Sequence, residues 1–246
     1  KAHYTPANAV LVVAGDVTAE QVKVLAEKYY GVLKNTFTPE PRVRTAEPDP
    51  IASRRVTLVD ARAASPVMQR SYFAPSYATA NGREALALDL LADILGSGTQ
   101  SRLYKNLVVD QKIAAHAAAW YSGDQLDSGT FGVYGAPNPG ADVAKVEAAI
   151  DAILADVLKN GVTQKELDRV RNQAIAERVY TLDNQAALAR MAGVALTTGL
   201  SARSIFDRDL DIEKVTLNDI KQAAEKFIVL KRSVTGILLP ETQTLN

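Results

Sequence analysis

The chain has 246 residues, of which 47% are hydrophobic and 23% are charged, a composition typical of a folded globular protein. Lysine plus arginine and aspartate plus glutamate number 28 each, so no net charge is present that would attract nucleic acid or an anionic membrane. No apolar run approaches the ~20 residues that cross a bilayer. The absence of cysteine excludes disulfides and thiolate chemistry.

Residues 1–35 predict one strand and one helix. The run from Ala9 to Ala14 is apolar throughout, which is typical of a buried strand. Thr18 and Gln21 have the spacing of a capping box, and apolar residues then recur at helical spacing over about residues 19–30. One strand and one helix bury each other poorly, so we expect residues 1–35 to be the tail of a larger, preceding module.

Residues 36–50 contain four prolines, which remove backbone donors and favour extended backbone, and we interpret this stretch as an interdomain linker. Residues 51–246 follow as a self-contained module. Its predicted strands cover about residues 55–60, 66–73, 113–122, 129–136 and 233–239. Its predicted helices cover about residues 81–96, 141–160, 184–198, 202–210 and 217–228. Two further helices are predicted from their caps: a short one after Gly98 that Thr99 or Ser101 can cap, and one that the capping box at residues 163–166 begins.

Several predicted helices follow one another without a strand between them, and this order, unlike strict alternation of strands and helices, predicts an α+β fold. We expect a two-layer sandwich with a mixed, mostly antiparallel sheet covered by helices on one face. The opening stretch, residues 4–16, and the closing stretch, residues 226–240, share an aromatic residue, a short gap and an apolar run. We interpret both stretches as closing strands of two successive modules.

Three stretches of the sequence carry a resemblance to a known family. Ser101-Arg102-Leu103-Tyr104 through Leu107, with the glycine-rich loop before it, resembles the second module of the insulinase-like (pitrilysin) zinc metallopeptidase family, in particular that of short bacterial members. Residues 4–16 resemble the close of the first module, and residues 161–167 resemble a helix junction late in the second. The three occur in the family's order across nearly the whole chain.

The resemblance implies a zinc peptidase whose metal site lies in the first module, as an inverted His-x-x-Glu-His helix and a later glutamate. Such a site activates a water molecule for attack on a peptide carbonyl. This chain has only two histidines, His3 and His116, which are 113 positions apart and too few for that motif. We therefore expect no catalytic residue and no metal ligand in this chain, and zinc to be held by residues outside it.

The candidate substrate-binding residues are Arg102, Tyr104 and His116. The resemblance implies that the loop and helix around Arg102 wall a substrate chamber, while the alternative is that Arg102 pairs locally and that Leu103 and Leu107 enter the core. For His116, which is flanked by alanines, the alternative is a packed histidine bonded within its sheet.

Larger family members hold the substrate backbone with an arginine and a tyrosine. The matching positions here are Val108 and Ala115, so that pair is absent. The small residues Ala114 to Ala119 still offer a wall for a cavity.

Other chemistries find no support in the sequence. Ser65, Ser97 and Ser101 lack a Gly-x-Ser-x-Gly setting, and the loop at residues 96–98 lacks the Gly-Lys-Ser/Thr of a phosphate loop. The carboxylates of Asp207 and Asp209 are interpreted as surface charges rather than as a glycosidase pair.

Two functions remain open. The first is the C-terminal half of a zinc metalloendopeptidase, which encloses a peptide or unfolded polypeptide together with an upstream zinc-bearing module or a paired subunit. The second is a non-catalytic scaffold or partner subunit of the same family. We expect no nucleic-acid partner, no membrane span, a natural start upstream of Lys1 and, by family habit, a bacterial periplasmic location.

Overall fold

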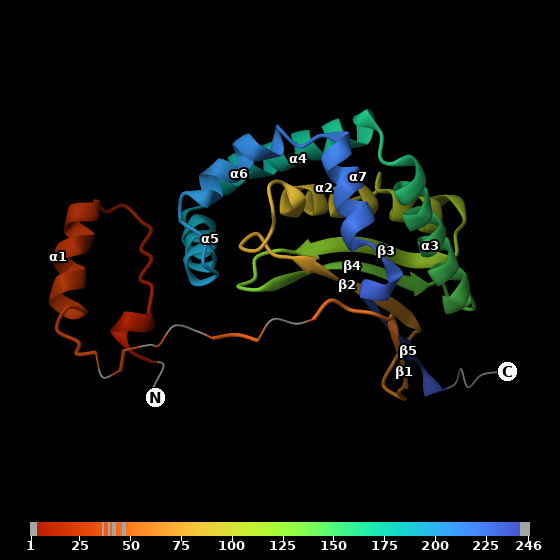
Figure 1. Cartoon of the computed structure of the whole chain (residues 1–246), viewed down its shortest axis with the longest axis horizontal. Helices are drawn as coiled ribbons and strands as arrows, with labels where there is room; N and C mark the ends of the chain where they lie inside the picture. The colour runs from red at the N-terminus through yellow and green to blue at the C-terminus, as the bar shows by residue number, and fades with distance from the viewer. Residues whose placement is uncertain (1–3, 36, 39, 41–42, 46–47, 242–246) are drawn as a thin grey trace. The chain divides into compact units, whose positions relative to one another are not determined.

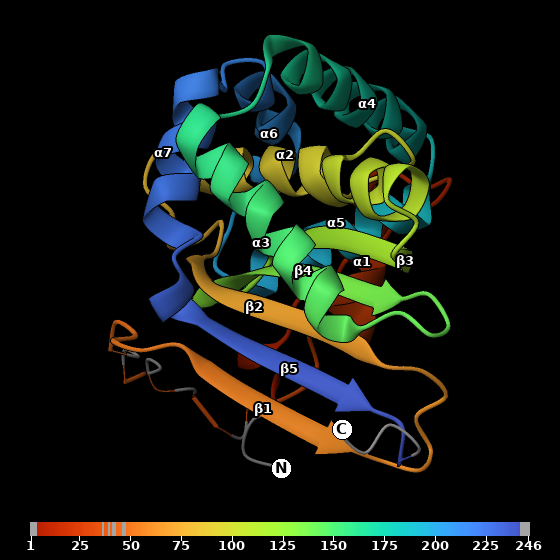
Figure 2. The same cartoon turned by 90° about the vertical axis from the view of Figure 1, so that its right-hand side faces the viewer.

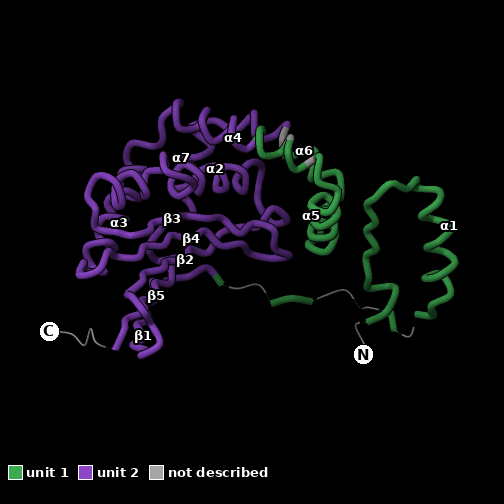
Figure 3. Tube along the Cα trace, turned by 180° about the vertical axis from the view of Figure 1, so that it is seen from behind, with its two compact units in different colours: residues 1–48, 175–209 green, residues 49–174, 210–246 purple. Residues whose placement is uncertain are grey.

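A computed structural model describes residues 4–35, 37–38, 40, 43–45 and 48–241. His3 and part of the predicted linker, including Pro39 and Pro41, lie outside the described residues. The chain splits into two compact units, residues 1–48 with 175–209, and residues 49–174 with 210–246 (Figure 3). Among the described residues, no helix combines the length and apolar character that a membrane crossing requires.

The second unit is built on one five-stranded sheet with the order β1-β5-β2-β4-β3 (Figure 2). β1 pairs with β5 in parallel, and the other three pairings are antiparallel. The strands are β1 (Arg54–Val59), β2 (Val67–Pro75), β3 (Ala114–Ser122), β4 (Ser128–Pro137) and β5 (Ser233–Leu239). All five lie where the apolar runs predict them.

Three helices cover one face of this sheet: α2 (Glu84–Gly96), α3 (Val143–Asn160) and α7 (Leu217–Phe227) (Figure 1). Alternation along β4 shows the two faces, because Phe131 and Val133 are buried in the core while Tyr134 is half-exposed. A Cβ added at Gly135 would meet the side chains of Val146 and Ile150 on α3. The predicted α+β sandwich with helices on one face is therefore confirmed.

Helix α2 is buried all round, which is why its sequence carries apolar residues on every side. The helix begins at Glu84, later than the predicted start near residue 81, and its N-cap residue Arg83 makes no side-chain cap hydrogen bond. The backbone N–H of Asn81 instead donates to Glu84 Oε2 at 3.1 Å. Leu91 and Ile94 of this helix are fully buried in the core.

The described residues also form α1 (Ala19–Tyr29), α4 (Gln164–Leu182), α5 (Gln185–Thr197) and α6 (Ser204–Ile212), short helices at Pro6–Asn8 and Leu230–Arg232, and a π-helix at Tyr104–Asp110. The capping boxes predicted at Thr18 and Thr163 are both present. In the first unit, Arg178 of α4 donates to the carbonyl of Ile205 on α6 at 2.7 Å. The described residues of the predicted linker lie outside helices and strands.

The strand predicted at Ala9 to Ala14 is wrong. These residues belong to no strand, and Val10, Leu11 and Val13 are about half exposed. An apolar run becomes a strand only when a partner satisfies its backbone, and none of the strands that the structure describes pairs with it. Of the two stretches compared as closing strands, only the later one, which contains β5, forms a strand.

Candidate functional site

Arg102 is tied to the junction between α3 and α4. Its Nε and Nη2 atoms donate to the two carboxylate oxygens of Glu166 at 2.6 and 2.8 Å. Nη1 donates to Asp156 at 2.9 Å, and Nη2 also donates to the carbonyl of Gly161 at 3.2 Å. This bidentate arrangement matches the planar guanidinium to the carboxylate. Leu103 and Leu107 are fully buried, as the alternative predicted. Arg102 pairs with residues 54 to 64 positions away rather than with local ones.

Glu166 serves both this ion pair and the N-terminus of α4. Its Oε2 atom accepts hydrogen bonds from the backbone N–H and the hydroxyl of Thr163, both at 2.8 Å. Burial acts to raise the pKa of Glu166, but the hydrogen bonds from Arg102 and Thr163 outweigh it and lower the pKa to about 2. The pair is therefore ionised at neutral pH.

The helix after Arg102 is a π-helix, Tyr104–Asp110, a rare form that is frequent at functional sites. Its wider register is visible in pairs five residues apart: Gln111 N–H donates to Asn106 O at 2.9 Å, and Lys105 pairs with Asp110 at 2.7 Å. Tyr104 is half-buried at the start of this helix.

The π-helix is followed by Lys112, whose φ of 55° lies in the left-handed region. The side-chain amide of Asn138, in the turn after β4, donates to the Lys112 carbonyl at 2.7 Å. The backbone N–H of Asn138 donates to Ile113 O at 3.0 Å. The two hydrogen bonds from Asn138 thus stabilise Lys112, just before β3, in a backbone conformation that lysine rarely adopts.

His116 lies on β3, the last strand of the sheet, and is exposed. The interpretation of His116 as a packed histidine is therefore wrong, since its side chain points away from the helical layer. Its ring meets Tyr134 of β4 edge to face, with centroids 5.7 Å apart. On the same face, Trp120 lies over Gly132, where an added Cβ would come 2.2 Å from the indole. These residues form an aromatic patch on the face of the sheet opposite α2, α3 and α7.

A β-bulge lies between Ala114 and His116, so Ala115 has no partner on β4 and is exposed. A pocket of about 500 Å³ opens beside it. Small and proline side chains supply most of its wall, among them Pro66, Ala115, Ala136, Pro139 and Pro240. The small side chain of Ala115 leaves this space open.

The three candidate substrate-binding residues do not converge. Arg102 lines a different pocket of about 400 Å³, between the π-helix and α3, together with Lys105 and Asp156. His116 contributes to the aromatic patch instead. Among the described residues, the site region consists of the edge of β3 and the small-residue pocket beside Ala115.

Among the described residues, no group of three or more His, Asp or Glu side chains is placed to hold a metal ion. The residues that the structure describes do not fit a catalytic zinc ion, which needs three protein ligands. Asp207 forms an exposed ion pair with Arg203 at 3.5 Å, and the side chain of Asp209 lies outside the described residues.

Sequence reasoning missed the charged cluster around Arg70 on β2. The Arg70 side chain is buried, pairs with Glu147 at 2.7 Å and with Asp151 on α3, and donates to the Thr235 hydroxyl at 2.8 Å. Arg55 of β1 forms a bidentate pair with the same Glu147 at 2.7 and 2.8 Å. The partners of Arg70, which are Glu147, Asp151 and Thr235, lie 77 to 165 positions from it in the sequence, so no local pattern predicts these contacts.

The described residues form an α+β module in which a mixed sheet carries helices on one face. The chain belongs to the M16 peptidase family, since residues 1–174 match the family model described as the Peptidase M16 inactive domain.

Several known proteins are similar to the chain. It is 24% identical to the zinc protease PqqE of Helicobacter pylori, over 97% of this chain and 53% of that protein. It is 26% identical to the mitochondrial-processing peptidase subunit beta of Saccharomyces cerevisiae, over 96% of this chain and 52% of that protein. The chain therefore spans about half the length of these curated relatives.

Solved structures show the same fold. A protease from Helicobacter pylori superposes with a TM-score of 0.88 at 24% identity, over 97% of this chain and 57% of that one. A peptidase M16 inactive domain from Pseudomonas fluorescens superposes with a TM-score of 0.74 at 18% identity, over 92% of this chain and 52% of that one.

Proposed function

We propose that this chain is the C-terminal half of a zinc-dependent metalloendopeptidase of the M16 family, and that it forms the chamber wall opposite a zinc-bearing half and helps to enclose a peptide substrate. The observation that carries the proposal is the match of residues 1–174 to the family's inactive domain. Enclosure by two halves excludes water from the peptide bond and commits the substrate to reaction. In this division of labour, zinc and the general base come from the other half.

The edge of β3 supports a role in contacting peptide. The outer side of β3 pairs with no strand among those described, and its side chains from Ala114 to Ala119 are small apart from His116. An extended peptide binds to such an edge through main-chain hydrogen bonds, while neighbouring pockets select side chains. The pocket beside Ala115 is adjacent to this edge and would receive one side chain of the peptide.

We propose the same domain division that the sequence predicts: residues 1–35 as the tail of a preceding catalytic-type module, residues 36–50 as a linker, and residues 51–246 as the second, non-zinc-binding module. In its support, α1 has no buried residue, and the apolar run at Ala9 to Ala14 has no strand partner among the described residues. Both features fit a tail whose sheet lies elsewhere.

The partners that follow are an upstream zinc-bearing module or a paired subunit, and an unfolded polypeptide as substrate. The yeast relative is a subunit of the mitochondrial-processing peptidase. We propose a periplasmic location, which is supported by the fold of the periplasmic protease PqqL from Escherichia coli, with a TM-score of 0.70 at 15% identity.

The second candidate function is a non-catalytic scaffold. It is favoured by Val108 and Ala115, which stand where larger family members hold the substrate backbone with an arginine and a tyrosine. A scaffold would pair with a catalytic half without contributing to peptide binding.

The test is to mix the purified chain with a zinc-bearing M16 half and to follow a quenched peptide. We expect no hydrolysis by this chain with added zinc, and chelator-sensitive hydrolysis by the mixture. Chelator-sensitive hydrolysis by this chain alone would contradict the proposal. A stable complex that leaves the activity of the zinc-bearing half unchanged would support the scaffold instead.

A further inference from the structure

The outer edge of β1 is an unprotected strand edge in the described part of the sheet. β1 lies at the end of the sheet, next to β5 (Figure 2), and all six of its residues are exposed. Val56 is 60% exposed and Leu58 is 56% exposed. Its pairing with β5 runs over six residues without a bulge, and β1 contains no proline. Native proteins usually protect a regular, exposed strand edge of this kind or pair it with another strand.

The direction of the backbone groups along β1 follows from one hydrogen bond. The N–H of Asp60, directly after β1, donates to the carbonyl of Leu239 on β5 at 3.0 Å. Because successive residues of a strand point their backbone groups to opposite sides, Arg54, Val56 and Leu58 also face β5. The N–H and C=O groups of Arg55, Thr57 and Val59 therefore point outward and are the groups available to a further strand.

We propose that β1 pairs antiparallel with β1 of a second copy of this chain, with Thr57 opposite Thr57 on a two-fold axis. Two antiparallel strands related by a two-fold axis present the same edge to each other, so one surface serves both partners. In this register Val56 lies opposite Leu58, and Arg55 lies opposite Val59. The two five-stranded sheets become one continuous sheet.

Charge complementarity selects this register. Arg54 at the start of β1 comes opposite Asp60 at its end, so the dimer gains an Arg54–Asp60 pair at each end of the strand pair. These are non-hydrogen-bonded positions, where facing side chains are closest. Opposite charges, apolar pairs and Thr–Thr pairs all stabilise antiparallel strands, and each is present in this register.

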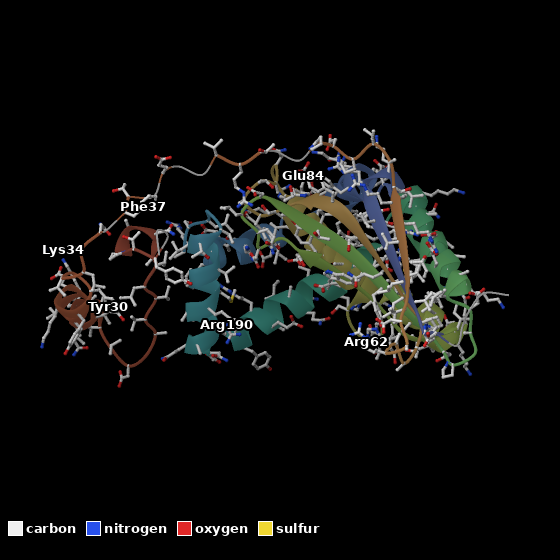
Figure 4. All side chains as sticks on the ribbon, turned by 90° about the horizontal axis from the view of Figure 1, so that it is seen from below. Tyr30, Lys34, Phe37, Arg62, Glu84 and Arg190 are labelled. Carbon is white, nitrogen blue, oxygen red and sulfur yellow. The ribbon has the colours of Figure 1, made fainter. Side chains whose placement is uncertain are left out.

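The neighbouring registers are worse. A shift of one pair in one direction places Arg54 opposite Leu58 and removes the ion pair. A shift in the other direction places Arg54 opposite Arg62, which lies in the connection after β1 (Figure 4), and brings like charges together. Asp60 already accepts hydrogen bonds from the Arg62 guanidinium at 2.9 and 2.7 Å. A carboxylate has lone pairs for several donors, so Arg54 of the second copy can be added.

The size of the contact sets the expected affinity. One strand pair buries less surface than a standard stable interface, so we expect a dimer with a Kd of roughly 0.1 mM. The dimer does not depend on the proposed peptidase role, because it uses the sheet edge opposite β3.

The experiment is sedimentation velocity of the 246-residue chain over a concentration series that extends into the high micromolar range, with circular dichroism to confirm folding. We expect a monomer–dimer equilibrium. Arg54→Asp places two carboxylates at each end of the strand pair and should raise the Kd about tenfold, more at low salt. The control Lys165→Asp makes the same charge change at an exposed position on α4 and should leave the Kd unchanged.

Charge exchange tests the register itself. Arg54→Asp combined with Asp60→Arg restores opposite charges and should return the Kd towards that of the unaltered chain. Since Asp60 also holds Arg62, a second exchange is needed: Val56→Lys should weaken the dimer, and Val56→Lys with Leu58→Glu should restore it. A chain that stays monomeric at every concentration overturns the proposal. So does a folded pair of exchange variants that fails to restore association.

Discussion

At the scale of single residues, the two arginines that share Glu147 show how burial changes the strength of an ion pair. The side chain of Arg70 is 4% exposed and that of Arg55 is 53% exposed. A buried charge that loses its partner carries a desolvation cost, whereas an exposed pair is screened by water. We therefore expect the two arginines to contribute very differently to stability, although both lie 2.7 Å from the same carboxylate.

Arg70→Ala is predicted to lower the free energy of unfolding by about 3 kcal/mol, because it leaves Asp151 and the Thr235 hydroxyl without their common donor and Glu147 with one arginine. Arg55→Ala is the matched control and is predicted to cost less than about 1 kcal/mol. Urea denaturation followed by circular dichroism measures both. Equal losses for the two variants would contradict the assignment of the buried arginine as the stronger contact.

Glu166→Gln tests the cluster around Arg102 through pH. The folded-state pKa of Glu166 is about 2, below the ordinary value of 4.5, so its stabilising contribution is present above about pH 4.5 and is lost as the pH falls towards 2. The variant is predicted to be about 1–3 kcal/mol less stable at pH 7. The difference between the variant and the unaltered chain should shrink between pH 4.5 and 2.

Glu213→Gln, at an exposed position between α6 and α7, is the control for this pH series. It should track the unaltered chain at every pH in thermal denaturation. A Glu166→Gln difference that stays constant from pH 7 to pH 2 would show that the ion pair with Arg102 is not what stabilises the junction.

At the scale of elements, most helices and strands could be predicted because their patterns are local. The apolar spacing of α3, the capping boxes at Thr18 and Thr163, and the alternation in β4 each need only a few neighbouring residues. The parallel pairing of β1 with β5 and the π-register after Arg102 need contacts that are distant in sequence or a change of helical geometry. Neither leaves a periodic signal.

Of the candidate site, sequence patterns predicted the elements but not the directions of the side chains. The strand around His116 was predicted from the sequence. The exposure of the His116 side chain could not be, because it depends on β3 lying at the edge of the sheet and on the bulge at Ala115. The run at Ala9 to Ala14 shows the converse: its composition favours a strand, but pairing decides whether one forms.

The close approach of α2 to β3 depends on Gly96. A Cβ at this position would lie 1.7 Å from the backbone nitrogen of Ala119, and backbone cannot move without displacing the strand. Gly96→Ala is therefore predicted to lower the free energy of unfolding by about 3 kcal/mol or more. Urea denaturation measures the loss, and Gly15→Ala, where nothing lies within 4 Å, is the neutral control.

Gly132→Ala is predicted to be milder, because the Cβ would meet the movable side chain of Trp120 rather than backbone. Trp120 is the only tryptophan, so its fluorescence reports the displacement directly. We expect a red-shifted emission for Gly132→Ala and none for Gly236→Ala, where the nearest atom is 3.9 Å away. Unchanged emission in Gly132→Ala would show that the indole does not lie over this glycine.

At the scale of the whole molecule, the two compact units differ in how much apolar surface they bury. In the second unit, α2 alone contributes nine buried residues to the core. In the first unit, α1 has none, and several of its apolar side chains, including Val24, Leu25 and Tyr29, are more than half exposed. Exposed apolar side chains at this density are typical of a surface that another protein covers.

Hydrogen exchange measured by mass spectrometry tests that difference. An 11-residue helix without tertiary packing is marginal in water, so the amides of α1 and of Ala9 to Ala14 should exchange at least about a thousandfold faster than those of α2. Addition of a zinc-bearing M16 half should slow the exchange of α1 and leave α2 unchanged, since a covering surface protects only what it covers. Slow exchange of α1 in the chain alone would show that it is packed without a partner. If an unrelated protein slowed the exchange of α1 equally, the exposed surface of α1 would not be specific for the zinc-bearing half.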